Sequence, residues 1–286
     1  MELFKSIILG IVQGLTEFLP VSSSGHLVIL PYIFGWDFIP VYYAVILHFA
    51  TLLSLVTVFF KDIWLVILWF VKGIFIRENR KNSYFKLGVY IIAASIPAAV
   101  AGFFLEEYVE SFFSRPFYVA CFLVLTSVFL ILSEYAGKKA ESSVQKQTGK
   151  FSLFNRKLNF VSSFIIGIGQ AIAIFPGLSR SGTTISFARV FGIKREECVK
   201  FSFLLSVPVI LGAFIFEMAK SFKDIVLLPL NAIINISAGF IFSFASGVIA
   251  IKLLLNIVKK RNLNFFAIYC FIIAVVIFTL SILRKI

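Results

Sequence analysis

The chain has 286 residues, of which 60% are hydrophobic and only 14% charged, and its mean hydropathy is +0.99. Soluble domains carry charge on about a quarter of their residues, so this composition excludes a soluble globular protein. The net charge of +13 resembles that of a nucleic-acid binder, but the lysines and arginines lie mainly in short links between apolar runs. The positive-inside bias of membrane proteins explains that placement, so we expect no nucleic-acid partner.

The first predicted element is a broken helix. Residues 3–19 can form a helix, but Pro20 and a run of three serines interrupt it, and the apolar run resumes at residues 26–34. The second piece would be about 14 Å long, against a bilayer core of about 30 Å. We therefore expect a re-entrant helical hairpin, with its irregular backbone covered by protein or facing a wet cavity.

Long apolar runs follow, each of a length that can cross a bilayer. In the first half they are residues 41–60, 88–105 and 117–132, and in the second half residues 201–218, 234–255 and 265–283. A shorter run at residues 63–76 is expected along the inner membrane surface. Residues 160–191 form a second broken element, with its break at Pro176 and Gly177. The predicted fold is all-α and membrane-integral, with six transmembrane helices and two re-entrant hairpins.

An internal repeat organises these elements. GIVQGLTEFLPVSSSGHL (residues 10–27) aligns without gaps on GIGQAIAIFPGLSRSGTT (residues 167–184), with seven of eighteen positions identical. Chance in this composition gives about two identities. We therefore predict a first repeat over residues 1–137, a charged cytoplasmic link over residues 138–157 and a second repeat over residues 158–286.

The charges of equivalent links indicate an inverted repeat. Residues 106–116 are net acidic, whereas the equivalent residues 252–262 are basic. Equivalent links of opposite charge are expected on opposite sides of the membrane, which places residues 77–86, 137–157 and 252–262 inside and residues 106–116 outside. Arg284 and Lys285 then fall outside, against the bias. Inverted repeats commonly hold a site at the midplane, between broken helices.

The first copy of the motif carries an acid beside a set of hydroxyls. Gln13 and Glu17 are four residues apart and share a helix face. An ionisable Glu17 in an apolar segment costs roughly 2.5–3.5 kcal/mol, so a functional role is favoured over a misread helix end. The serines of the break are suited to cap the next helix, whose N-terminus attracts anions. They are Ser22, Ser23 and Ser24.

The second copy carries Arg180 where the first copy has Ser23. A guanidinium presents a fixed fork of donors that suits phosphate oxygens. The alternative is an arginine that reaches the membrane interface, but Arg180 lies mid-segment, directly behind a Pro-Gly break. Hydroxyls around it reinforce the preference for an anion. They are Ser179, Ser181, Thr183 and Thr184.

The two histidines receive different interpretations. His26 follows the first break by one turn and could act as a general base near neutral pH. His48 lies in a spanning run without a motif, which favours a structural role. Converging hairpins would bring Glu17 and His26 toward Arg180. A diphosphate with a divalent ion, Mg²⁺ or Ca²⁺, suits that pocket, with Glu17 facing the metal.

The segments QGLTEFLPVSSSGHL and PGLSRSGTT resemble the two signature motifs of the bacterial undecaprenyl-diphosphate phosphatases, the bacitracin-resistance (BacA-type) family. The resemblance covers nearly the whole chain, including FSFLLSVP at residues 201–208. It implies hydrolysis of undecaprenyl diphosphate to the monophosphate and inorganic phosphate, which recycles the lipid carrier for cell-wall synthesis. It also implies a divalent cation, a multi-pass protein of the bacterial cytoplasmic membrane, and a site that opens to the outer face.

The resemblance assigns roles to particular residues. It implies that Ser23 is the nucleophile and that His26 activates it, while Gln13 and Glu17 match an acidic pair in which many members have Glu at the position of Gln13. It implies phosphate binding by Ser179, Arg180, Ser181 and Thr184. The substrate would be an isoprenyl diphosphate lipid lying among membrane lipids, and a homodimer is left open.

Two alternatives remain at this point. A water molecule could attack the phosphorus directly, with Ser23 only binding the substrate. The protein could also be a transporter or lipid flippase, because inverted repeats with a midplane anion site are the usual construction of such carriers. A nucleophile and base close to an arginine favour the enzyme.

Overall fold

The computed structural model describes residues 2–144 and 158–283, which form helices and one 3-10 turn and contain no strand. Their bounds are α1 Leu3–Phe18, α2 Ser23–Phe34, α3 Val41–Val58, α4 Phe60–Phe75, η1 Arg77–Lys81, α5 Ser83–Phe104, α6 Glu106–Phe112, α7 Pro116–Val144, α8 Phe160–Ile172, α9 Arg180–Val190, α10 Arg195–Lys220, α11 Phe222–Val226, α12 Leu230–Lys260 and α13 Asn264–Leu283.

Six of the described helices are long and apolar enough to cross a membrane: α3, α5, α7, α10, α12 and α13. Each of them holds all or nearly all of one of the six long apolar runs, which confirms the prediction of an all-α membrane protein with six spanning helices. Helix α7 continues to Val144, so the first residues of the predicted link extend this helix. The rest of that link, residues 145–157, and the charged C-terminal residues lie outside the described residues.

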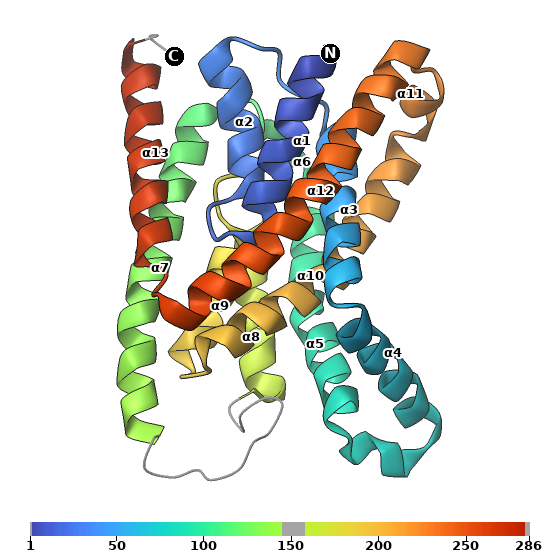
Figure 1. The fold of residues 1–286 in the computed structure, drawn as a ribbon, viewed down its shortest axis with the longest axis vertical. Coiled ribbons are helices and arrows are strands. Elements are labelled where there is room, and N and C mark those ends of the chain that lie inside the picture. The colour runs from blue at the N-terminus through green and yellow to red at the C-terminus, as the bar shows by residue number, and fades with distance from the viewer. Residues whose placement is uncertain (1, 145–157, 284–286) are drawn as a thin grey trace.

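Helix α4 holds the shorter run at residues 63–76. It has 16 residues and packs on α5, at the end of the molecule away from both termini (Figure 1). The rings of Phe70 and Phe85 stack with centroids 5.8 Å apart. Its predicted position along the inner membrane surface remains a prediction.

The two broken elements form helix pairs that start from opposite ends of the molecule. Helix α1 begins at the end that holds both termini, and α2 returns to it, whereas α8 begins at the opposite end (Figure 1). The first chain break, at residues 19–22, and the second, at residues 173–179, both lie inside the molecule. Both elements are therefore broken helix pairs, and their re-entrant placement in the membrane remains a prediction.

Helices of each half pack mainly on helices of the other half. Helix α1 packs along α12 of the second half, and α8 packs along α5 of the first half. In the same way α3 packs on α12 and α10 packs on α5, while α7 packs on α13. The same pairings recur with the halves swapped, as an inverted repeat requires. The halves therefore interdigitate, and neither predicted repeat encloses a core of its own.

Two equivalent glycines of the repeat allow α1 to pack closely on α12 and α8 to pack closely on α5. A Cβ atom on Gly10 of α1 would lie 2.2 Å from the carbonyl oxygen of Gly239 on α12. A Cβ atom on the equivalent Gly167 of α8 would lie 2.4 Å from the carbonyl oxygen of Ala94 on α5. Only glycine permits such close backbone contact, so the identity of these two positions in the repeat has a packing cause.

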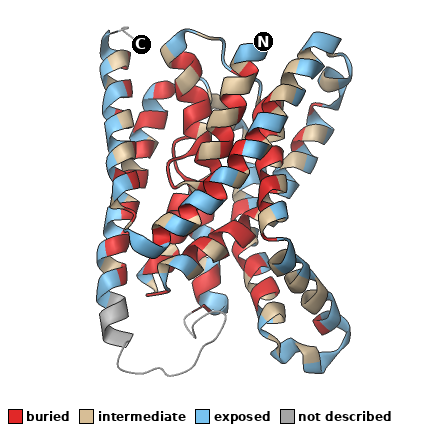
Figure 2. Cartoon of the chain, in the orientation of Figure 1, coloured by how far each residue is buried: buried red, intermediate tan, exposed pale blue. Residues whose placement is uncertain are grey.

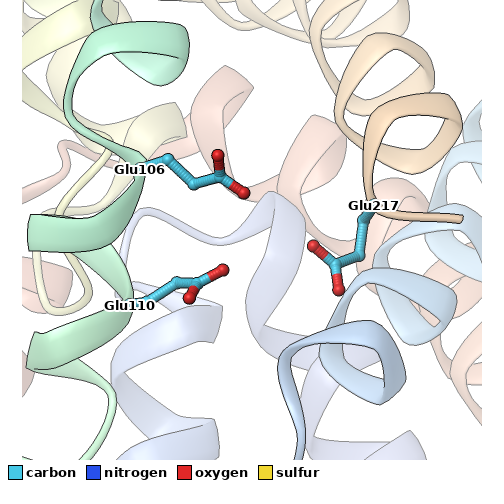
Figure 3. Close-up of side chains that lie close together, drawn as sticks. All are labelled: Glu106, Glu110 and Glu217. Carbon is cyan, nitrogen blue, oxygen red and sulfur yellow. The ribbon is translucent and has the colours of Figure 1, made fainter. Parts of the chain in front are cut away.

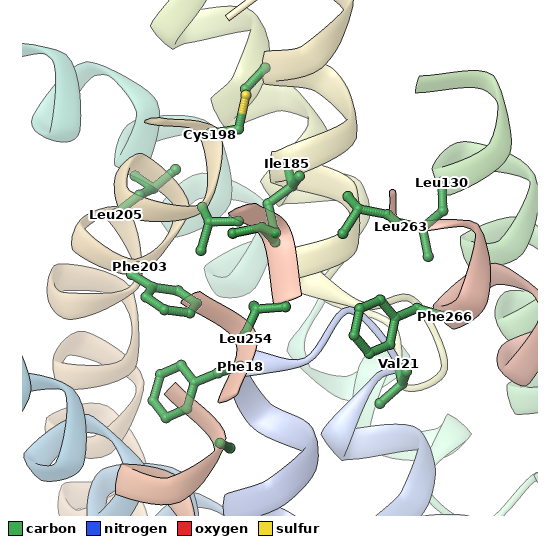
Figure 4. Close-up of a cluster of buried hydrophobic side chains, with 14 of the residues drawn as sticks. Phe18, Val21, Leu130, Ile185, Cys198, Phe203, Leu205, Leu254, Leu263 and Phe266 are labelled. Carbon is green, nitrogen blue, oxygen red and sulfur yellow. The ribbon is translucent and has the colours of Figure 1, made fainter. Parts of the chain in front are cut away.

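The main core surrounds the two breaks. Buried residues concentrate around α1, α2, α9 and the middle of the long helices, while the outer helix faces are exposed and apolar (Figure 2). Figure 4 shows Phe18 at the end of α1 and Val21 within the first break, both in this core with Phe203 and Phe266. The rings of Phe18 and Phe203 meet edge to face with centroids 5.2 Å apart. The exposed apolar belt is suited to lipid contact.

Candidate active site

The two breaks meet directly. The N–H of Gly177 in the second break donates to the Oγ of Ser22 in the first, at 3.1 Å. The Oγ of Ser181 donates to the carbonyl oxygen of Leu19, also at 3.1 Å. The convergence expected from the inverted repeat is therefore present in the structure, and groups of both halves lie within reach of one another.

Each break ends in a serine-capped helix, which confirms the prediction made for the first break and extends it to the second. The Oγ of Ser22 accepts a hydrogen bond from the N–H of Gly25 at 3.2 Å. The Oγ of Ser179 accepts one from the N–H of Gly182 at 3.0 Å. Both are N-cap bonds at the first turns of α2 and α9. Two helix N-termini, each favourable to negative charge, thus flank the contact between the halves.

Glu17 is the centre of the polar network. It is only 6% exposed, and its Oε1 lies 2.5 Å from Nη2 of Arg180. Its Oε2 accepts hydrogen bonds from the Oγ of Ser23 at 2.5 Å and from Nε2 of Gln13 at 2.9 Å. Nε2 of His48 lies 3.3 Å from the same oxygen. These neighbours stabilise the ionised carboxylate in a site that is largely closed to water.

His26 lies close to this network but bonds elsewhere. Nδ1 of His26 lies 2.7 Å from the carbonyl oxygen of Ser22, and Nε2 lies 2.7 Å from the phenol oxygen of Tyr269 on α13. Within the described residues, the group hydrogen-bonded to the Oγ of Ser23 is Glu17. The ring of His26 does not hydrogen-bond the Ser23 hydroxyl in this arrangement, so the activation of Ser23 by His26 remains a prediction.

The hydroxyls predicted to bind phosphate serve several structural purposes. Ser179 caps α9 and lies 3.2 Å from the Oγ of Ser181. Thr184 donates to the carbonyl oxygen of Arg180 at 2.8 Å and lies 2.7 Å from the Oγ of Ser202 on α10. The buried hydroxyl of Thr183 has no hydrogen-bond partner among the described residues. These contacts hold the loop that presents Arg180.

In the first break, Ser24 is half-buried, with its Oγ 3.4 Å from the Oγ of Ser22. It therefore lies at the edge of the network. The structure brings Gln13, Glu17, Ser23 and Arg180 into direct contact and leaves Ser24 apart from them.

A cavity of about 500 Å³ begins at Arg180. Its walls come from α3, α5, α6, α8 and α10 and are mainly apolar, with Gln170 as a polar group near the arginine. The cavity follows α10 from Pro208 to Glu217, roughly 14 Å along the helix axis. It therefore connects the polar network with the end of the molecule where α6 lies.

Three carboxylates lie at the α6 end of the cavity, from Glu106, Glu110 and Glu217 (Figure 3). One oxygen from each carboxylate lies within 4.8 Å of the corresponding oxygens of the other two. Nζ of Lys220 bonds Glu106 at 2.8 Å and Glu110 at 2.5 Å, while Glu217 accepts a hydrogen bond from Ser221 at 2.6 Å. Lys220 thus supplies a counter-charge and ties α10 to α6.

The contacts of Glu17 do not fit a divalent ion bound to its carboxylate. One oxygen is occupied by the guanidinium of Arg180 and the other by Ser23 and Gln13, with His48 close by. A metal would have to replace these donors. The buried Oε1 of Gln13 has no partner in the described part of the chain, but a single amide oxygen does not make a metal site.

Two residues of the site were not predicted to belong to it. His48 was assigned a structural role, yet it faces Glu17. The signal that could have identified His48 is its ionisable ring within a spanning run, the same argument that identified Glu17. Tyr269 has no motif around it, and no feature of the sequence relates it to His26.

Comparison with known proteins identifies the family of this chain. An undecaprenyl-diphosphatase of Methanococcus vannielii is 39% identical over 270 residues, covering 94% of this chain and 96% of the relative. One of Methanobrevibacter smithii is 40% identical, with 99% of each chain covered, and one of Caldicellulosiruptor bescii is 37% identical over the full length of both. The family model described as bacitracin resistance protein BacA matches residues 6–276, so the chain belongs to the BacA family.

Proposed function

We propose that this protein hydrolyses undecaprenyl diphosphate to undecaprenyl phosphate and inorganic phosphate. The family membership and the names of the full-length relatives support this reaction. The observation that carries it is the contact of Arg180, Glu17 and Ser23 at the junction of the two halves. A cation for phosphate, a carboxylate and a nucleophile lie together there, beside an apolar cavity suited to part of a hydrocarbon tail.

Ser23 attacks the terminal phosphorus in the proposed first step. Its proton passes to Oε2 of Glu17, the group to which it is already hydrogen-bonded. The new Ser23 Oγ–P bond forms as the bond from phosphorus to the bridging oxygen breaks, and undecaprenyl phosphate leaves. Phosphate oxygens compete with Glu17 for the Arg180 guanidinium. Transfer of Arg180 to the substrate stabilises the transferring group and makes Glu17 a stronger base.

Water completes the reaction in the proposed second step. The water oxygen bonds to phosphorus, the Ser23 Oγ–P bond breaks, and inorganic phosphate is released. Ser23 regains its proton from Glu17. His26 takes one proton of the water molecule and gives it to the departing phosphate, which restores the neutral ring. Direct attack by water on the substrate, with Ser23 only binding it, is the alternative chemistry.

A transporter is the second candidate function, because the exchanged pairing of the two halves is also the construction of carriers that work by alternating access. Proteoliposomes that contain undecaprenyl diphosphate separate the two functions. We expect phosphate release by the wild type and a loss of about 100- to 1,000-fold for Arg180→Ala. Arg115→Ala, at an exposed arginine, is the matched control and should retain activity. Lipid movement between leaflets without phosphate release would overturn the proposed hydrolase.

We place the protein in the bacterial cytoplasmic membrane, with the end that holds α6 and both termini facing outward. The basic links 77–86 and 252–262 then face the cytoplasm. The cavity reaches the α6 end, which supports a site that opens outward. Recycling of the lipid carrier would serve cell-wall synthesis and give bacitracin resistance. A cysteine introduced at Glu107 should react with an impermeant thiol reagent in intact cells, and labelling only after lysis would reverse the orientation.

Dependence on Mg²⁺ or Ca²⁺ also remains part of the proposal. Because the donors around Glu17 do not fit a metal, no step is assigned to one. A homodimer is a further prediction, which the mass of the detergent-solubilised protein would test.

A further inference from the structure

The ring of His26 is held between groups that the second half of the chain controls. One side of the ring bonds the carbonyl oxygen of Ser22, and the other bonds the hydroxyl of Tyr269, each at 2.7 Å. The rings of His26 and Tyr269 are nearly parallel, at 5°, with centroids 5.7 Å apart. His26 itself is 7% exposed. Both of its nitrogens are therefore engaged, and its rotation is restricted.

These contacts determine which nitrogen of the neutral ring carries the proton. A carbonyl oxygen can only accept, so Nδ1 of His26 must be the donor to Ser22. Nε2 of the neutral ring is then the acceptor, and the phenol O–H of Tyr269 must donate to it. Nε2 is thus kept as the basic nitrogen, with one partner at a defined position.

The carbonyl group that orients Nδ1 is itself held in place. Ser22 has φ of 68°, the only positive φ among the described residues other than glycine. Such a conformation is strained for a residue with a side chain and persists only where the surroundings enforce it. The N–H of Gly177 bonds the Oγ of Ser22, so the second half fixes this turn. Its position in turn directs the carbonyl oxygen of Ser22 at His26.

We infer that Tyr269 is a positioning residue for the reaction: its O–H holds the His26 ring with the lone pair on Nε2, and it gives up that lone pair when Nε2 takes the proton of the attacking water. The inference rests on the proposed function, in which His26 takes a proton from water. Tyr269 acts through His26 and contributes no bond to the phosphoryl group. Removal of its hydroxyl should therefore lower kcat and leave KM nearly unchanged.

Nitrogen NMR on histidine-labelled protein tests the contact without measuring activity. The chain has only two histidines, so each ring can be assigned from a variant in which the other is replaced. In the wild type we expect His26 with its proton on Nδ1 and a hydrogen-bonded Nε2. Tyr269→Phe should shift the Nε2 signal of His26 and leave His48 unchanged. Tyr135→Phe, at a tyrosine that is 75% exposed on α7, should alter neither ring.

Steady-state kinetics then test the role. We expect Tyr269→Phe to lower kcat roughly ten- to a hundred-fold, and His26→Ala with Tyr269→Phe to be no slower than His26→Ala alone. An unchanged His26 spectrum or full activity in Tyr269→Phe, with His26→Ala inactive, would overturn the inference alone. An additional loss in the double variant would also overturn it, since Tyr269 would then act independently. Full activity of His26→Ala would instead refute the proposed base.

Discussion

Arg180 and Glu17 lie 163 residues apart in the chain, yet Nη2 of one is 2.5 Å from Oε1 of the other. Their side chains are only 15% and 5% exposed. In the absence of substrate each therefore neutralises the other. This ion pair joins the two hairpins, and it holds the Arg180 guanidinium that the phosphate of the substrate is expected to bind.

Breaking this pair should destabilise the protein. Removing one partner of a buried ion pair costs about 3–5 kcal/mol, because the other charge stays buried and unpaired. We expect Glu17→Ala and Arg180→Ala each to lower the unfolding free energy by about that amount, and the double variant to lose less than their sum. Reversible unfolding in detergent micelles measures this. Lys220→Ala, which breaks an ion pair whose lysine is 45% exposed, should cost about 1 kcal/mol or less.

A phosphorylated Ser23 should accumulate when substrate is mixed rapidly with enzyme and quenched in acid. The reason is the hydrogen bond from Ser23 to Glu17, which places a proton acceptor on the nucleophile. Mass spectrometry of the peptide around Ser23 detects the adduct, and Ser114→Ala, at an exposed serine, is the matched control for Ser23→Ala. Full activity of Ser23→Ala would favour direct attack by water.

His48 should contribute to activity although no motif surrounds it. Its Nδ1 lies 2.7 Å from the carbonyl oxygen of Ala44, and its Nε2 faces Glu17. His48→Ala removes this contact with the carboxylate and should lower kcat/KM by about tenfold. Phosphate-release assays measure kcat/KM, and an unchanged value in His48→Ala would show that His48 only contributes to packing.

Alanine at Gly10 should be destabilising, whereas alanine at Gly212 should not. The new Cβ atom would meet the backbone of Gly239 at Gly10 and no atom within 4 Å at Gly212. Overpacking costs about 1–3 kcal/mol, while alanine in an open helix position gains about 0.5–1 kcal/mol over glycine. Thermal unfolding of the two variants should therefore shift in opposite directions. Equal shifts in the unfolding temperature of the two variants would mean that α1 and α12 can move apart without loss of stability.

Removal of divalent ions with a chelator tests the cation requirement. Titration of the ion back into the enzyme then distinguishes an ion bound only to the substrate from one bound by the carboxylates at the cavity end. If activity falls on treatment with a chelator and returns with Mg²⁺ or Ca²⁺, the cation requirement of the proposal holds. A metal on the substrate alone should leave the required concentration unchanged in Glu217→Gln. A metal held by the carboxylates at the cavity end should raise that concentration in Glu217→Gln relative to the wild type. Activity that survives complete chelation would contradict the requirement.

The fold was largely predictable because its signals are local or repeated. Runs of apolar residues determine the six spanning helices, and Pro20 and Pro176 mark the two breaks. Ser22 was expected to cap a helix and does so, and its equivalent in the repeat, Ser179, caps the corresponding helix of the second half. The identity of Gly10 and Gly167 was also visible, and the structure supplies its cause in the close contacts of α1 and α8.

The side-chain partners within the site were less predictable. The contact between His26 and Tyr269 joins residues separated by 243 positions, and it depends on where α13 packs, which apolar periodicity does not specify. The hydrogen-bond partner of Ser23 was equally hard to predict. Glu17 and His26 both lie near Ser23 in the sequence, and the path of the backbone through the break determines that the Ser23 hydroxyl bonds Glu17 and not His26.

The bond from Gly177 to Ser22 has a consequence for biogenesis. The ribosome delivers the serine turn long before the glycine that holds it, and the tyrosine beside His26 arrives only with the last helix. A nascent chain that stops before the second break therefore holds Glu17 and Ser23 without Arg180. The two halves expressed as separate polypeptides should for that reason be active only after they associate.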